Sequence, residues 1–289
     1  MARLSFSGHE SFQCRNLWLK KGYDYTQSGG DFRDDLAVVN LGVGKNMVTA
    51  IKYWLRSFNL VDEDGQLNEI SNLILHDDGK DPFLEDIGSL WLLHYKLVTT
   101  NKASVFNLFF NHFRKKRIEF SKEYFLNFLT TECNLRNENH SENTLETDFG
   151  VLLKTYVRPS SKNDYSDIED SFSSLLIDLE LIKPVFNRKD WYECRNEERT
   201  SLPTEIVFYS ILSNPKFSTS KSISFNHLLN DENSPGVVFA LDADSLLKYV
   251  LAISKKYNGI SFKDDAGIRV MQIKKNYSPL SVLEEYYEE

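Results

Sequence analysis

A glycine-rich turn that opens into one strongly two-faced helix constrains this chain more than any other stretch. The turn is Leu41-Gly42-Val43-Gly44, and the predicted helix runs from Lys45 to Phe58. Its apolar positions follow helical spacing; they are Met47, Ile51, Trp54 and Phe58. Polar residues repeat on the other side at similar spacing; they are Lys45, Asn46, Thr49, Lys52 and Arg56. We expect one side to pack and the other to face solvent.

The residues on both sides of this helix indicate a DNA-binding arrangement. A short helix is expected at 35–41, and the glycines after it tolerate the dihedral angles of a tight turn. After the helix, Leu60 to Leu67 places an Asp64-Gly65 turn between apolar ends, which predicts a hairpin. This order favours a winged helix whose polar face binds DNA. The alternative is a core helix with a solvated basic face.

Charge is segregated along the chain. The net charge is −8, yet residues 1–56 carry eight basic and five acidic side chains, and only Glu119 is acidic between Lys96 and Lys122. An acidic average argues against a general nucleic-acid coating protein, whereas local basic zones are compatible with phosphate contacts. Ordinary solvated faces remain the alternative.

The whole chain is expected to fold as a mainly α protein. We predict winged-helix or helix-turn-helix domains at both ends, a helical middle region and a few short β-hairpins. The predicted domains are 1–80, 81–215 and 216–289. Residues 158–164 have the most linker-like composition, a helix is expected at 168–182, and the C-terminal domain is expected to place a hairpin (260–262 with 268–271) after the helix 242–256.

The apolar runs, the N-terminus and the cysteines of the sequence predict where in the cell the protein is found. No apolar run reaches the roughly 18 residues of a membrane helix, and the N-terminus has no signal-peptide core. Cys14, Cys133 and Cys194 are odd in number and widely spaced, which is typical of reduced thiols. We expect a cytoplasmic protein with no membrane partner. A homodimer is left open.

The N-terminal motif places an imidazole beside a carboxylate. His9 and Glu10 follow Gly8, and such a pair can move a proton or bind a metal; a turn or cap role is the alternative. A helix is expected after this motif, with Gly22 as its C-cap.

Five carboxylates gather between Asp77 and Asp86. Mg²⁺ binds carboxylates together with water and phosphate oxygens, so this cluster is a candidate metal site. The alternative is capping, because Asp81 before Pro82 is a good helix start and Glu85 and Asp86 would complement the helix dipole.

Further basic residues are candidate phosphate contacts; they are Arg15, Lys20, Lys21, Lys115 and Lys116. The last two belong to a basic tetrad at the end of a predicted helix, where positive charge is favoured in any case.

Several motifs within residues 7–95 resemble one bacterial family. They are Ser7-Gly8-His9-Glu10-Ser11-Phe12, Trp18-Leu19-Lys20-Lys21-Gly22, Leu41-Gly42-Val43-Gly44-Lys45-Asn46-Met47-Val48, Asp81-Pro82-Phe83-Leu84-Glu85-Asp86 and Leu90-Trp91-Leu92-Leu93-His94. The family consists of domains of unknown function linked to DNA phosphorothioation gene clusters, and it is similar to the SspB component of single-strand phosphorothioation systems.

The resemblance implies a DNA-nicking protein of an anti-phage phosphorothioation system. Its partners would be DNA, a cysteine desulfurase, a sulfur-transfer enzyme and an ATPase, and its cofactor Mg²⁺ or Mn²⁺. Nicking requires an in-line attack on a phosphodiester with the developing charge stabilised. On that reasoning the candidate catalytic residues are His9, Glu10, Asp81, Glu85 and Asp86. A non-catalytic winged-helix adaptor and a transcriptional regulator are the alternatives.

Overall fold

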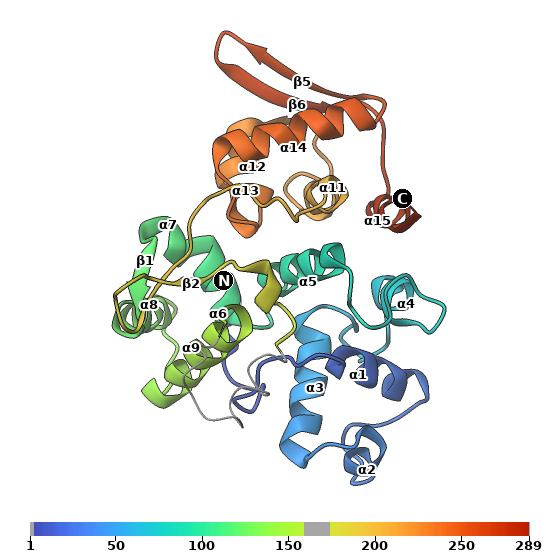
Figure 1. The fold of residues 1–289 in the computed structure, drawn as a ribbon, viewed down its shortest axis with the longest axis vertical. Coiled ribbons are helices and arrows are strands. Elements are labelled where there is room, and N and C mark those ends of the chain that lie inside the picture. Colours follow the sequence, from blue (N-terminus) through green and yellow to red (C-terminus); the bar gives the residue numbers. More distant parts are fainter. Residues whose placement is uncertain (1–2, 159–173, 289) are drawn as a thin grey trace. The chain divides into compact units, whose positions relative to one another are not determined.

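The computed structural model describes residues 3–158 and 174–288, which divide into two units, 1–194 and 195–289. Figure 1 shows that most of the chain is helical, which confirms the predicted mainly α class. The division into three domains stays a prediction. Among the described residues, no helix is both long and apolar enough to cross a membrane.

The first unit begins with three helices that surround the glycine-rich turn. They are α1 (Trp18–Gln27), α2 (Ala37–Leu41) and α3 (Lys45–Ser57). The turn itself uses the freedom of glycine, because Gly42 has φ +64°. A single antiparallel bridge, Val61 to Leu67, closes the expected hairpin after α3. Helix α4 (Glu69–Leu75) follows, with Asn68 as its N-cap.

The rest of the first unit packs an aromatic core. Its elements are α5 (Ile87–Thr99), α6 (Ser104–Leu108), the π-helical turn η1 (Phe109–Phe113), α7 (Arg114–Lys116), β1 (Glu119–Ser121), α8 (Lys122–Leu135), α9 (Glu142–Tyr156), the 3₁₀ turn η2 (Ile177–Leu179), β2 (Lys183–Pro184) and β3 (Trp191–Glu193). The ring centroids of Trp54 and Phe106 are 6.0 Å apart, and both rings are fully buried. Helix α3 is thus anchored in this core. A small antiparallel sheet has the order β1-β3-β2.

The second unit combines helices with the other three-stranded sheet. Its elements are α11 (Thr204–Ser213), β4 (Ser222–Ser224), α12 (Phe225–Asn230), α13 (Pro235–Val238), α14 (Ala243–Lys256), β5 (Ile260–Asp265), β6 (Ile268–Ile273) and α15 (Pro279–Glu288). The strand order is β4-β6-β5, and Met271 pairs with both Ile223 and Phe262. Lys256 ties α14 to its neighbours through Glu205 (2.8 Å) and Glu285 (3.3 Å). The hairpin predicted after the long helix is confirmed.

Two predicted helix ends are wrong. Gly22 does not end a helix but lies inside α1, where a Cβ would approach Ile51 Cγ2 to 2.7 Å and Leu55 Cδ1 to 2.8 Å. Glycine is therefore used for close helix packing. Helix α5 begins at Ile87 rather than Pro82, because Asp86 is the residue that caps it.

The expected helix at 168–182 is also corrected in part. Residues 159–173, which hold most of the expected linker and the start of this helix, lie outside the described residues. Within 174–182 the only helical turn is η2. The chain there forms a bridge between Ser174 and Arg15 instead, so it lies against the N-terminal segment.

Candidate nucleic-acid interface

The polar side of α3 is presented to solvent as the sequence predicted. Ala50, Ile51, Trp54 and Leu55 are buried. The residues proposed to meet DNA are exposed or half-buried; they are Lys45, Asn46, Thr49, Lys52 and Arg56. The predicted buried face is confirmed for Ile51, Trp54 and Phe58, while Met47 is half-buried. From here on, we call these five residues, Lys45, Asn46, Thr49, Lys52 and Arg56, the α3 polar face.

Two cations of the α3 polar face are not neutralised by neighbours. Among the described residues, Lys52 and Arg56 form no hydrogen bond or ion pair through their side chains, so their donors are available to an incoming anion. Their charge is felt nearby, since Lys52 helps to lower the pKa of Asp31 and Arg56 that of Glu63. The carboxylates of Asp31 and Glu63 therefore lie close enough to Lys52 and Arg56 to feel their charges.

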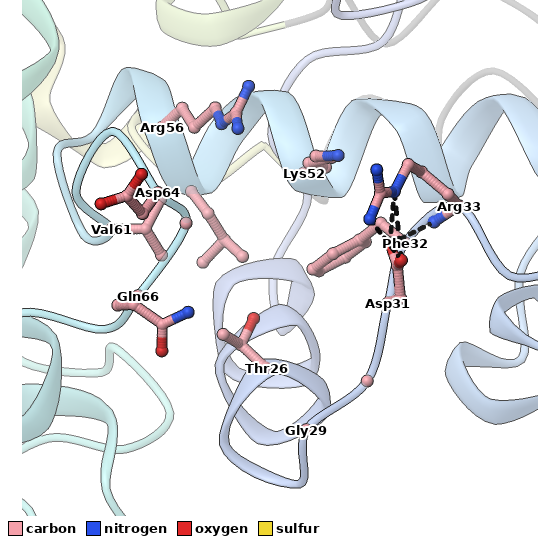
Figure 2. Close-up of a pocket in the computed structure, with 13 residues that line it drawn as sticks. Thr26, Gly29, Asp31, Phe32, Arg33, Lys52, Arg56, Val61, Asp64 and Gln66 are labelled. Carbon is pink, nitrogen blue, oxygen red and sulfur yellow. Dashed lines mark hydrogen bonds and ion pairs between the residues drawn. The ribbon is translucent and has the colours of Figure 1, made fainter.

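A pocket of about 390 Å³ lies beside this face. Figure 2 shows residues from three elements that line it. They are Lys52 and Arg56 on α3, Arg33 and Phe32 on the 29–33 loop, and Gln66 on the turn after α3. Arg33 holds Asp31 through Nε (3.1 Å) and Nη2 (2.8 Å). Hydrogen bonds from Arg33 lower the pKa of Asp31 to about 2.

The basic residues of the N-terminal segment are engaged by the protein. Lys20 is buried and pairs with Asp24 (2.5 Å) and Asp77 (2.6 Å). Burial by itself lowers the pKa of Lys20, but the two carboxylates outweigh it and the net pKa is raised. Lys21 donates to the carbonyl oxygen of Leu41 at 3.2 Å.

The remaining basic candidates lie on other elements. The Arg15 guanidinium lies 5.6 Å from the Phe12 ring centroid and 5.5 Å from that of Trp18. Lys115 and Lys116 are exposed on α7, and Lys116 Nζ lies 5.3 Å from the Phe128 ring centroid. These residues are thus not part of the α3 polar face.

His9 is completely buried and faces Asp148 on α9. The distance from His9 Nε2 to Asp148 Oδ2 is 3.3 Å, and the His9 Nδ1 atom accepts a hydrogen bond from the Ser11 N–H at 3.2 Å. An accepting Nδ1 places the proton of a neutral imidazole on Nε2, toward the carboxylate. The pair therefore fixes the N-terminal segment to α9.

The loop around His9 is shaped for this packing. Gly8 has φ +88°, and a Cβ there would lie 2.8 Å from Tyr53 Cδ2. The Trp54 indole N–H donates to the Phe12 carbonyl oxygen at 3.2 Å. Both contacts join the loop to the packed side of α3.

Two of the candidate catalytic carboxylates accept backbone hydrogen bonds, and two others are exposed. Asp81 is buried and accepts hydrogen bonds from the N–H groups of Glu85 (2.9 Å) and Asp86 (3.1 Å). Asp86 in turn accepts from the N–H groups of Gly88 (2.7 Å) and Ser89 (3.2 Å) and so caps α5. Glu10 and Glu85 are exposed.

The carboxylates of this turn accept backbone hydrogen bonds. Both oxygens of Asp81 and the Oδ1 atom of Asp86 do so. Among the described residues, no group of three or more potential metal ligands occurs.

Sequence reasoning missed three residues of these sites. Asp148 lies far along the chain from His9, and no local pattern links them. Arg33 and Gln66 are near α3 in sequence, but only the fold shows that they line the same pocket.

The arrangement is that of a mainly α protein with an exposed, cationic helix on a three-helix unit. A family model described as a protein of unknown function (DUF4007) matches residues 6–287, and the chain belongs to this family. Two crystal structures of SspB, one of them magnesium ion-bound, are similar to the chain. Each matches with a TM-score of 0.87 and 29% identity over 99% of this chain and 88% of that chain. No match was found among functionally curated proteins.

Proposed function

We propose that this protein binds DNA through the α3 polar face and serves in a bacterial DNA phosphorothioation system. The proposal depends mainly on two cations, Lys52 and Arg56, on the polar side of a helix that follows a glycine-rich turn; within the described residues their side chains form no hydrogen bond or ion pair. Lysine and arginine side chains supply most of the affinity of such proteins for the phosphate backbone. The similarity to SspB supports the assignment to phosphorothioation.

Both ends of the chain are proposed to be winged helices. In the first unit, α2, the turn and α3 are followed by the bridged hairpin at Val61 and Leu67. In the second unit, the order helix, strand, three helices and hairpin, together with the pairing of β4 with β6, supports the same architecture. The two hairpins would then act as wings beside DNA.

The binding proposal is tested by fluorescence anisotropy with a short DNA duplex. The triple variant Lys45→Ala, Lys52→Ala and Arg56→Ala should bind at least about tenfold more weakly, because three phosphate contacts are lost. A control of equal charge change removes Lys154, Lys189 and Lys216, which are exposed on other elements. Equal affinities of the two triple variants would contradict the proposal.

Strand nicking is the second candidate function, favoured by the similarity to SspB, which has been crystallised with magnesium. The assay uses supercoiled plasmid with Mg²⁺ or Mn²⁺, with the protein alone and with its sulfur-transfer partner. Relaxed circles are expected if the protein nicks. Binding without any relaxed product would leave the adaptor function, and tight binding to one operator sequence would favour the regulator.

A further inference from the structure

The pocket beside α3 has the size and shape of a small-ligand site. Its volume of about 390 Å³ falls within the range of about 300–1,000 Å³ that is usual for such sites. It is bounded by the end of α1, the 29–33 loop, α3 and the turn after α3. The α3 polar face forms one of its walls, so a ligand there would lie next to DNA bound on that face.

One group of lining residues suits a phosphate. Lys52 and Arg56 bring two positive charges to the pocket, whose lining also includes Asp64 and the paired Arg33 and Asp31. Asp31 is already held by Arg33, and its low pKa keeps it ionised and paired. The side chains of Lys52 and Arg56 can therefore donate hydrogen bonds to an anion. Arginine in particular binds phosphate through two parallel hydrogen bonds.

A second group suits a nucleobase. Phe32 is half-buried, makes an edge contact with Tyr25 (ring centroids 5.1 Å apart), and reaches from its loop toward α3 in Figure 2. Leu55 and Val61 add apolar surface, and the exposed Gln66 amide offers both a donor and an acceptor. Aromatic stacking combined with one or two polar groups is how proteins hold unstacked bases.

We propose that this pocket binds a single nucleotide, with its phosphate at Lys52 and Arg56 and its base against Phe32 and Gln66. One source is a nucleotide that leaves the base stack of DNA bound to the α3 polar face, which rests on the proposed function; the other is a free nucleotide. Enzymes that do chemistry on a base extrude one nucleotide from the stack in this way.

The pocket itself is tested without DNA. The experiment is saturation-transfer NMR with the full-length protein and each of the four deoxynucleoside monophosphates. Saturation of the protein should be transferred to the base protons of a bound monophosphate. Phe32→Leu and Gln66→Ala should each reduce this transfer severalfold. Asn143→Ala, which changes an exposed residue of α9 outside the pocket, should leave it unchanged. Gln66 is exposed, so its variant separates loss of binding from loss of folding.

The DNA source is tested with 2-aminopurine in a duplex. Its emission should rise at least about twofold on binding, and Phe32→Leu and Gln66→Ala should remove the rise while changing duplex affinity less than about threefold. Saturation transfer to the monophosphates without a rise in 2-aminopurine emission would mean that the pocket binds a free nucleotide. Absence of both signals in a protein that binds duplex DNA would overturn the inference. Absence of duplex binding with monophosphate transfer retained would overturn the proposed function alone.

Discussion

The imidazole of His9 lies 3.3 Å from the carboxylate of Asp148, with neither side chain exposed to solvent. The same Asp148 oxygen accepts the Ser7 N–H at 2.9 Å, so one carboxylate on α9 holds two groups of the N-terminal loop. The loop in turn packs on Tyr53 and Trp54 of α3. The position of the α3 polar face therefore depends on a contact that never meets DNA.

Asp148→Ala should lower the free energy of unfolding by about 1–3 kcal/mol, because it removes the acceptor of the Ser7 N–H and the carboxylate that faces the buried His9 ring. Urea unfolding followed by circular dichroism measures the loss. Asn143→Ala, exposed on the same helix, should change it by less than about 0.5 kcal/mol. Equal stability of the two variants would show that the buried pair contributes little.

Gly22→Ala should destabilise the first unit by about 1–3 kcal/mol. The added methyl group would press on Ile51 and Leu55, which are themselves buried, and crowding in a packed contact outweighs the helix preference of alanine. Gly150→Ala is the matched control, since Gly150 also lies inside a helix, α9, and a Cβ there has nothing within 4 Å. A Gly22→Ala protein at least as stable as wild type would mean that α1 and α3 can move apart freely.

Asp86→Ala should cost about 1 kcal/mol of stability through loss of the N-cap of α5. Glu85→Ala should have almost no effect, because that side chain is exposed. Calorimetric titration with Mg²⁺ separates the two functions predicted for this cluster. If both variants lost a metal-binding signal that the wild type shows, the cluster would be a metal site and the capping account would be incomplete.

Asp31 should titrate near pH 2, well below its ordinary value, because Arg33 donates to its ionised form. Since the folded-state pKa is lowered, the pair stabilises the folded state above the ordinary carboxyl pKa, and this contribution is lost as the pH falls toward 2. Carboxyl ¹³C NMR titration measures the midpoint. In Arg33→Ala the midpoint should rise toward 3.8; an unchanged midpoint would assign the shift to another cause.

The parts of the fold that were predictable from sequence have strong local signals. The periodicity from Lys45 to Phe58 identified α3 and its two faces, and the predicted helix at 242–256 and the hairpin after it identified the C-terminal elements. Local signals gave the wrong start for α5, because two nearby residues can each act as an N-cap. Asp81 and Asp86 both suit a helix start, and only the buried position of Asp81, with its hydrogen bonds to residues 85 and 86, decides between them.

The candidate site was predictable on α3 and less so elsewhere. The role of a charged residue depends on partners that are distant in sequence, as with Lys20 and Asp77 or His9 and Asp148. The catalytic assignment of His9, Glu10, Asp81, Glu85 and Asp86 stays a prediction. The pocket needed the fold, because its walls come from four separate segments.

The salt dependence of DNA binding tests the central claim most directly. The logarithm of the binding constant should fall linearly with the logarithm of salt concentration, and the slope should be shallower by about 2.7 in the variant lacking Lys45, Lys52 and Arg56, since each phosphate contact contributes about 0.9. The account predicts this reduced slope together with weaker binding at about 100 mM salt. A slope identical to that of the wild type would contradict it, because the α3 polar face would then contact no phosphate.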